Sequence, residues 1–286
     1  MIRAVISAGA GNGLSFVVTD FTNEHLLSHL SATETRLAAA LLAPKRVALG
    51  CVAALTALGW LGLGLMAAGS PSNWQALCQP GVAGGFGGLV LLAPMWAAMT
   101  LAMMLPTAGP MILTYAEIAD TAARKREPVV SPLVLAAGYV AVWLGFALAA
   151  AFLQWNLARA GLLDGGRVGR LIGGTMFLGV GVYQFSALKQ SCLTLCQRPF
   201  PFFFSNWTTE RSGVFRLGLR QGMLCLGCCW AMMGLMFAVG TMNVVWMAVL
   251  GVLMTIEKLS TTSRFSEVVG LSFGAAGFAM VVSSVM

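Results

Sequence analysis

The chain has 286 residues, of which 58% are apolar and only 9% are charged, and its mean hydropathy is +0.83. An ordinary soluble domain carries about 25% charged residues, so this composition cannot cover a water-facing surface and predicts a lipid bilayer as the main solvent. The net charge of +7 falls mostly between the apolar runs rather than in one basic patch, which argues against nucleic-acid binding.

The first part of the chain, residues 1–45, differs in character from the rest and is predicted to be a cytoplasmic or interfacial segment. It contains both histidines, His25 and His29, and the amphipathic stretch Glu34–Leu42. Two histidines four residues apart could share a metal on one helical face. Two solvated histidines are the favoured interpretation, because no third ligand lies nearby in the sequence.

The rest of the chain, residues 46–286, is predicted to form a transmembrane helical domain. A membrane span needs about 20 mainly apolar residues. The apolar runs are Val47–Ala68, Leu89–Tyr115, Leu133–Trp155, Leu171–Leu188, Leu217–Val239, the short Met242–Ile256, and Phe265–Met286. The second run is interrupted by three prolines. The sequence therefore predicts an all-α, polytopic transmembrane bundle with about seven spans.

The distribution of Lys and Arg between the spans predicts the orientation of this bundle. Short cytoplasmic loops carry an excess of these residues. If the N-terminus is cytoplasmic, all 17 Lys and Arg lie on the cytoplasmic side except Arg159, Arg167 and Arg170. We therefore expect a cytoplasmic N-terminus, an outer C-terminus, and a multi-pass protein of a bacterial inner membrane.

The second span carries a methionine stripe. Met95, Met99 and Met103 recur every four residues, so they stack along one face of a helix. Thioether sulfur is a soft ligand suited to Cu(I). Methionine is also an ordinary filler of apolar cores, so the stripe alone leaves a metal track and simple packing both open.

Cysteines cluster at the end of the fourth span and in the fifth. Cys192 and Cys196 lie one turn apart if the fourth helix continues, so their thiolates could reach one metal. In the fifth span, helical spacing places five sulfur residues on one stripe: Cys225, Cys228, Cys229, Met232 and Met236. The alternative is that small residues there allow close helix packing.

The predicted orientation brings the two cysteine groups together. The fourth span runs inward and the fifth runs outward, so both groups fall at a similar depth on the cytoplasmic side. A shared site requires this placement. The cytosol is reducing, and the thiols are therefore expected to be free rather than locked in disulfides.

Several of these motifs together resemble a known family. They are Met95-Trp96-x2-Met99-x3-Met103-Met104-x-Pro106-x3-Pro110, Gly181-x-Tyr183-Gln184-x4-Lys189-x2-Cys192-Leu193-x2-Cys196-x2-Pro199, Cys225-x-Gly227-Cys228-Cys229-Trp230, Met242-Asn243-x2-Trp246-Met247 and Glu257-Lys258. The combination resembles a bacterial family of uncharacterised integral membrane proteins described as predicted to bind metal. It covers about Leu89 to Lys258. The resemblance implies a membrane helix bundle and a bound metal.

These observations favour a protein that binds a soft metal ion for handling, delivery or transport, with copper preferred and zinc possible. The predicted metal ligands are Met95, Met99, Met103, Cys192, Cys196, Cys225, Cys228, Cys229 and Met232. A membrane oxidoreductase, metal-centred or thiol/quinone-dependent, is the first alternative, so whether the chain is an enzyme stays open. A structural subunit without a metal is the second. A protein partner or a homo-oligomer is compatible with each.

Overall fold

The computed structural model describes residues 44–68, 86–125, 128–160, 167–239, 243–260 and 263–285. Residues 1–43 form a unit of their own, so the predicted N-terminal segment with His25 and His29 lies outside the described residues. Throughout the described ranges the regular structure is helical. The predicted all-α class is therefore confirmed.

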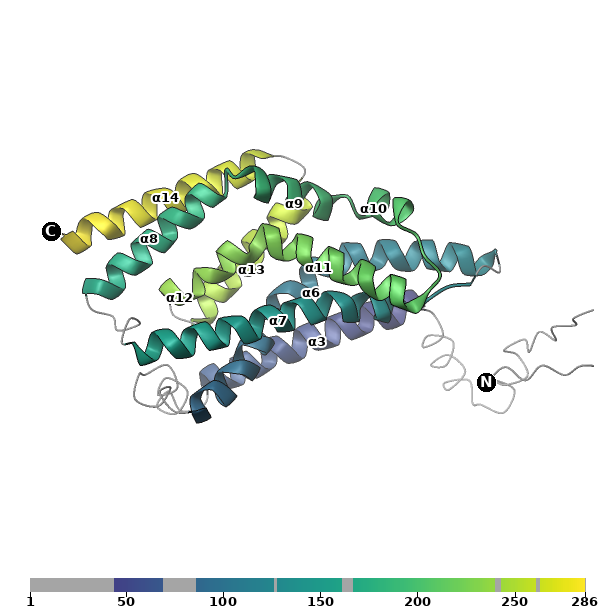
Figure 1. Ribbon diagram of the computed structural model, residues 1–286, viewed down its shortest axis with the longest axis horizontal. Helices are drawn as coiled ribbons and strands as arrows, with labels where there is room; N and C mark the ends of the chain where they lie inside the picture. The colour runs from purple at the N-terminus through teal and green to yellow at the C-terminus, as the bar shows by residue number, and fades with distance from the viewer. Residues whose placement is uncertain are drawn as a thin grey trace, which may run out of the picture. The chain divides into compact units, whose positions relative to one another are not determined.

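The helices keep their chain order in the following bounds. They are α3 (Pro44–Ala68), α6 (Phe86–Arg124), α7 (Pro132–Arg159), α8 (Arg167–Tyr183), α9 (Ala187–Gln197), α10 (Pro199–Ser205), α11 (Arg211–Gly234), α12 (Met236–Val239), α13 (Val244–Leu259) and α14 (Ser263–Val285). Figure 1 shows α8 running beside α14, and α3, α6 and α7 lying side by side. Helix α11 packs on α7 and α9, and α13 contacts α6 and α9.

Four helical segments are long and apolar enough to cross a membrane: Gly88–Ala122, Pro132–Arg159, Arg211–Val239 and Arg264–Val285. The pair α8 and α9 provides a fifth if the two are counted as one bent span. In α3 the apolar stretch Leu49–Leu65 is shorter, and α13 has 16 residues. The predicted number of seven spans stays a prediction.

Helix α6 runs continuously through the three prolines that were expected to interrupt it. Proline has no N–H and leaves the carbonyl four residues earlier without its helical donor. At Pro106 this carbonyl belongs to Ala102, and it accepts a hydrogen bond from Trp60 Nε1 at 3.1 Å. A neighbouring helix thus supplies the missing donor, which is how proline is tolerated inside apolar bundles.

The fourth predicted span is broken, which differs from the continuous helix expected from the sequence. Helix α8 ends at Tyr183, α9 begins at Ala187, and the two axes differ by 64°. Ser186 begins the new helix by accepting a hydrogen bond from the Lys189 amide at 3.2 Å, as an N-cap residue does. Cys192 and Cys196 therefore lie on a separate helix whose direction is set by this break.

Two glycines set the close approach of α7 and α11. A Cβ on Gly138 would clash with the backbone carbonyl of Phe215, and one on Gly218 with the carbonyl of Leu135. Small residues at such crossings let helix backbones come close together. This crossing fixes the position of α11, the helix that carries most of the cysteines.

We expect Gly138→Ala to destabilise the protein by about 1–3 kcal/mol, because the added methyl group overpacks the crossing of α7 and α11. Gly145 of the same helix faces open space, and Gly145→Ala should be neutral or stabilise by up to about 1 kcal/mol through helix propensity. The midpoint of thermal unfolding in detergent measures both. Equal midpoints for the two variants would contradict this account of the crossing.

Candidate metal-binding site

The sulfur stripe of α11 faces the interior of the bundle. Cys225 is 2% exposed, Cys228 and Cys229 are each 1% exposed, and Met232 and Met236 are fully enclosed in the same core. This is the face that helical spacing in the sequence predicted. The stripe therefore belongs to the protein interior and not to its outer surface.

Four cysteines form what we call the thiol cluster: Cys196 of α9 and Cys225, Cys228 and Cys229 of α11. The Sγ atoms of Cys228 and Cys229 are 3.4 Å apart. The Cys225 thiol interacts with both of these, and the Cys228 thiol interacts with that of Cys196. All four are free thiols. Two segments about thirty residues apart in the chain thus contribute sulfur to one place.

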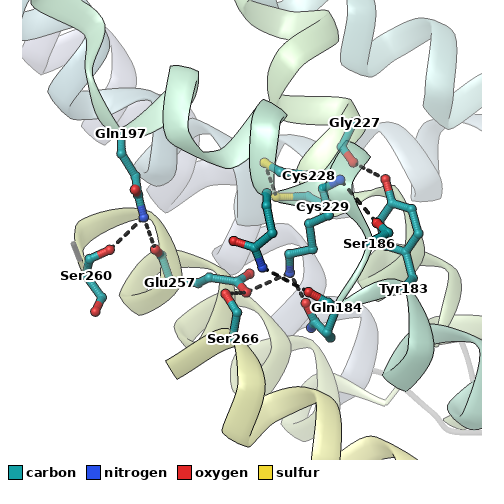
Figure 2. Close-up of polar contacts among 12 residues, drawn as sticks. Tyr183, Gln184, Ser186, Gln197, Gly227, Cys228, Cys229, Glu257, Ser260 and Ser266 are labelled. Carbon is teal, nitrogen blue, oxygen red and sulfur yellow. Dashed lines mark hydrogen bonds and ion pairs between the residues drawn. The ribbon is translucent and has the colours of Figure 1, made fainter. Parts of the chain in front are cut away.

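Cys192 lies on the same helix as Cys196 but meets a different part of α11. A Cβ on Gly227 would lie 2.7 Å from the Cys192 Sγ, so glycine makes room for this sulfur. The Gly227 carbonyl accepts a hydrogen bond from the Tyr183 hydroxyl at 2.5 Å (Figure 2). Cys192 therefore contributes to the packing of the break between α8 and α9 against α11.

Cys225 has polar partners from two further helices. Lys258 Nζ of α13 donates a hydrogen bond to its Sγ at 2.9 Å and another to Thr107 Oγ1 at 2.7 Å. The Tyr139 hydroxyl of α7 lies 3.0 Å from the same Sγ and 3.1 Å from the Met104 carbonyl oxygen. A thiolate at Cys225 would therefore form an ion pair with the Lys258 ammonium and accept a hydrogen bond from Tyr139.

A buried ion pair lies on the other side of α13. Lys189 Nζ and Glu257 Oε1 are 2.6 Å apart, with side chains 1% and 3% exposed. Ser266 donates a hydrogen bond to the same oxygen at 2.5 Å, and Lys189 also donates to Gln184 Oε1. Figure 2 shows Gln184, Glu257 and Ser266 converging at this point. Buried charges are tolerated when they are paired in this way.

Gln197 anchors the end of α9 to the end of α13. Its Nε2 donates hydrogen bonds to the carbonyl oxygens of Glu257 at 2.9 Å and Ser260 at 2.6 Å (Figure 2). Glu257 and Lys258 are consecutive residues, so the last turn of α13 binds α9 through one and reaches Cys225 through the other. The ion pair and the thiol cluster are therefore mechanically connected.

The methionine stripe of α6 is also interior. Met95, Met99 and Met103 are 3%, 0% and 2% exposed. Met103 faces Gly251 of α13, where its Cγ would lie 3.8 Å from an added Cβ. The stripe thus lines the contact between α6 and α13, and its role as a metal ligand stays a prediction.

The chemistry of the thiol cluster suits a soft, singly charged ion. Within the part of the chain that the structure describes, no three His, Cys, Asp or Glu side chains are grouped as a metal site. A pair of thiolates is sufficient for Cu(I), for which thiolate and thioether are the preferred ligands. The cluster offers such pairs together with a cation, Lys258, to balance their charge.

Sequence reasoning missed the polar residues around the cysteines. Lys258 was interpreted as a possible marker of the membrane interface, and Tyr139, Thr107 and Lys189 were not singled out as site residues. Three of these lie more than thirty residues from Cys225 in the chain, and a single sequence carries no signal for such pairings. Sequence did offer one indication, the lysine next to a glutamate at the end of an apolar run.

The comparisons with known proteins agree with this chemistry. A family model, PpoB2, described as a copper chaperone, matches residues 93–280, which is more than half of the chain and includes all four members of the thiol cluster. No curated protein and no solved structure matched the chain.

Proposed function

The chain belongs to the PpoB2 family of copper chaperones, and from this premise we propose that it is an integral membrane protein that receives Cu(I) at the thiol cluster and hands it on. Copper is the cargo in this proposal. The single observation that carries it is the cluster itself, in which buried free thiols from α9 and α11 lie beside the Lys258 ammonium.

Location in a membrane is supported by the outer surfaces of the helices. Large apolar side chains are exposed on many of them, among them Leu58 at 65%, Phe278 at 65% and Phe204 at 79%. Contiguous apolar surface of this kind suits contact with lipid. We propose seven spans with a cytoplasmic N-terminus, because Lys and Arg then lie mainly on the cytoplasmic side. The thiol cluster would open toward the cytoplasm.

Charge balance favours Cu(I) over Zn(II) at a pair of thiolates. Two thiolates around Cu(I) leave a single negative charge, which the Lys258 ammonium neutralises. The same pair around Zn(II) is already neutral, and Lys258 would then be an uncompensated cation in a dry interior, which is costly. We assign the primary pair to Cys225 and Cys228, because Cys228 Sγ points back to the Cys225 carbonyl at 3.1 Å and Cys225 contacts Lys258.

The buried methionines offer a continuation of the path. Met103 of α6 and Met247 and Met254 of α13 are each at most 2% exposed and belong to the same core as the cysteines. Thioethers bind Cu(I) more weakly charged than thiolates do and suit transfer by ligand exchange. We propose that these methionines take part in moving Cu(I) away from the thiol cluster.

Lys258→Met tests this proposal, because it removes the balancing charge and leaves every sulfur in place. We expect Cu(I) affinity to fall by about 10–100-fold, as for other residues that support metal ligands, while Lys258→Arg retains most of it. Competition of the purified protein with a Cu(I) chelator measures the affinity. If wild type and Lys258→Met hold copper equally well, or wild type binds none, the proposed site is wrong.

A further inference from the structure

A cavity of about 190 Å³ lies directly against the thiol cluster. At about 30 Å³ for each water of the bulk liquid, it has room for roughly six waters, which is the space of an amino-acid-sized molecule. Its polar wall comes from five helices and consists of Thr107, Tyr139, Cys196, Gln221, Cys225 and Lys258. Two thiols of the cluster are therefore accessible from one internal space.

Gln221 gives this cavity an unpaired hydrogen-bond acceptor. It lies one helical turn before Cys225 on α11 and is 2% exposed. Its Oε1 is buried and has no hydrogen-bond partner among the described residues. Buried acceptors are nearly always satisfied, and an exception calls for an explanation. A ligand with an N–H group in the cavity would satisfy it.

Lys258 gives the same cavity a positive charge. An ammonium has three N–H donors, and in the described part of the chain two of them go to Thr107 and Cys225. The third donor suits an anionic group of a ligand. The wall therefore combines thiols for a metal, a cation for an anion, and an acceptor for an N–H.

We propose, on the basis of the proposed function, that the cavity admits Cu(I) as a complex with a small amino-acid thiol, for which cysteine is the simplest example. The carboxylate of this carrier would pair with Lys258, its amino group would donate to Gln221 Oε1, and its sulfur would deliver the copper. This names the form in which the cargo arrives.

The transfer is a ligand exchange without a change in oxidation state. The Cu–S bond to the carrier breaks as a Cu–S bond to Cys225 forms, and copper stays Cu(I) throughout. The proton released by the protein thiol leaves on the departing carrier sulfur, which becomes a neutral thiol. No oxidant or reductant is needed, and the charge at the cluster stays balanced by Lys258.

The test uses the full chain in detergent and two sources of Cu(I), a cysteine complex and an acetonitrile complex without thiol. With radiolabelled cysteine, wild type should retain about one cysteine per chain only when Cu(I) is present. Gln221→Leu, which removes the acceptor at similar volume, should retain cysteine at least about tenfold more weakly. It should still load the wild-type amount of copper from acetonitrile.

A second comparison does not depend on the folding of a variant. Cu(I) complexed with mercaptoethanol, a thiol without amino or carboxylate groups, should be retained by wild type about tenfold less than the cysteine complex. Wild type that loads from acetonitrile but retains no cysteine, or retains both thiols equally, would overturn this inference and leave the proposed function standing. Failure to load from acetonitrile would overturn the proposed function itself.

Discussion

A chain in which Cys225 and Cys228 are both replaced by Ser is expected to lose high-affinity Cu(I) binding. Serine oxygen is a hard ligand and cannot replace a thiolate for Cu(I), so the loss should exceed the roughly 100-fold effect of a supporting residue. The two side chains are buried at 2% and 1% exposure, and serine is close in size to cysteine. Copper measured per purified chain after reconstitution gives the result.

The matched control is Cys51→Ser in α3. Cys51 is a free, half-buried cysteine away from the thiol cluster, so its replacement should leave the copper content unchanged. Thermal unfolding of both variants separates loss of a ligand from loss of fold. Copper content that stays at the wild-type level in the double variant would mean that other residues bind the metal.

Lys189→Met should be the most destabilising single change that we predict. It leaves Glu257 as a buried charge without its ammonium partner, and breaking such a pair costs about 3–5 kcal/mol. Because Glu257 lies on α13 and Lys189 on α9, we expect the contact between Cys196 and Cys228 to weaken too. Unfolding in mixed detergents, followed by tryptophan fluorescence, measures the stability.

The double variant Lys189→Met/Glu257→Leu provides the decisive comparison. Replacing both charges by apolar groups of similar size is often neutral, so stability should recover substantially from that of Lys189→Met. The control is Lys125→Met, because Lys125 is exposed and surface changes usually lie within about 0.5 kcal/mol. If the double variant is less stable than Lys189→Met, the pair does not act as a unit.

The helical class and the interior face of α11 could be predicted from the sequence because both depend on local pattern. Composition requires helices that satisfy their own backbone groups, and the spacing of Cys225, Cys228 and Met232 determines which face they share. The same reasoning predicted that the cysteines of the fourth and fifth spans meet. In the structure this holds for Cys196, whereas Cys192 packs against Gly227.

The break between α8 and α9 was not predicted because it depends on contacts made far away in the chain. The apolar run continues through this point, and Ser186 is the local signal for a new helix. What stabilises the bend is the pairing of Lys189 with Glu257, 68 residues later. Such distant polar partners, like Lys258 for Cys225, are decided by tertiary packing and leave no periodic trace in one sequence.

The most direct test of the central claim is X-ray absorption at the copper edge of the purified, Cu(I)-loaded wild-type protein. The account predicts Cu(I) coordinated by sulfur alone, with a pair of sulfur ligands, and a spectrum that changes when Cys225 is replaced by Ser. Copper coordinated by nitrogen or oxygen, or a spectrum that is indifferent to Cys225, would contradict it.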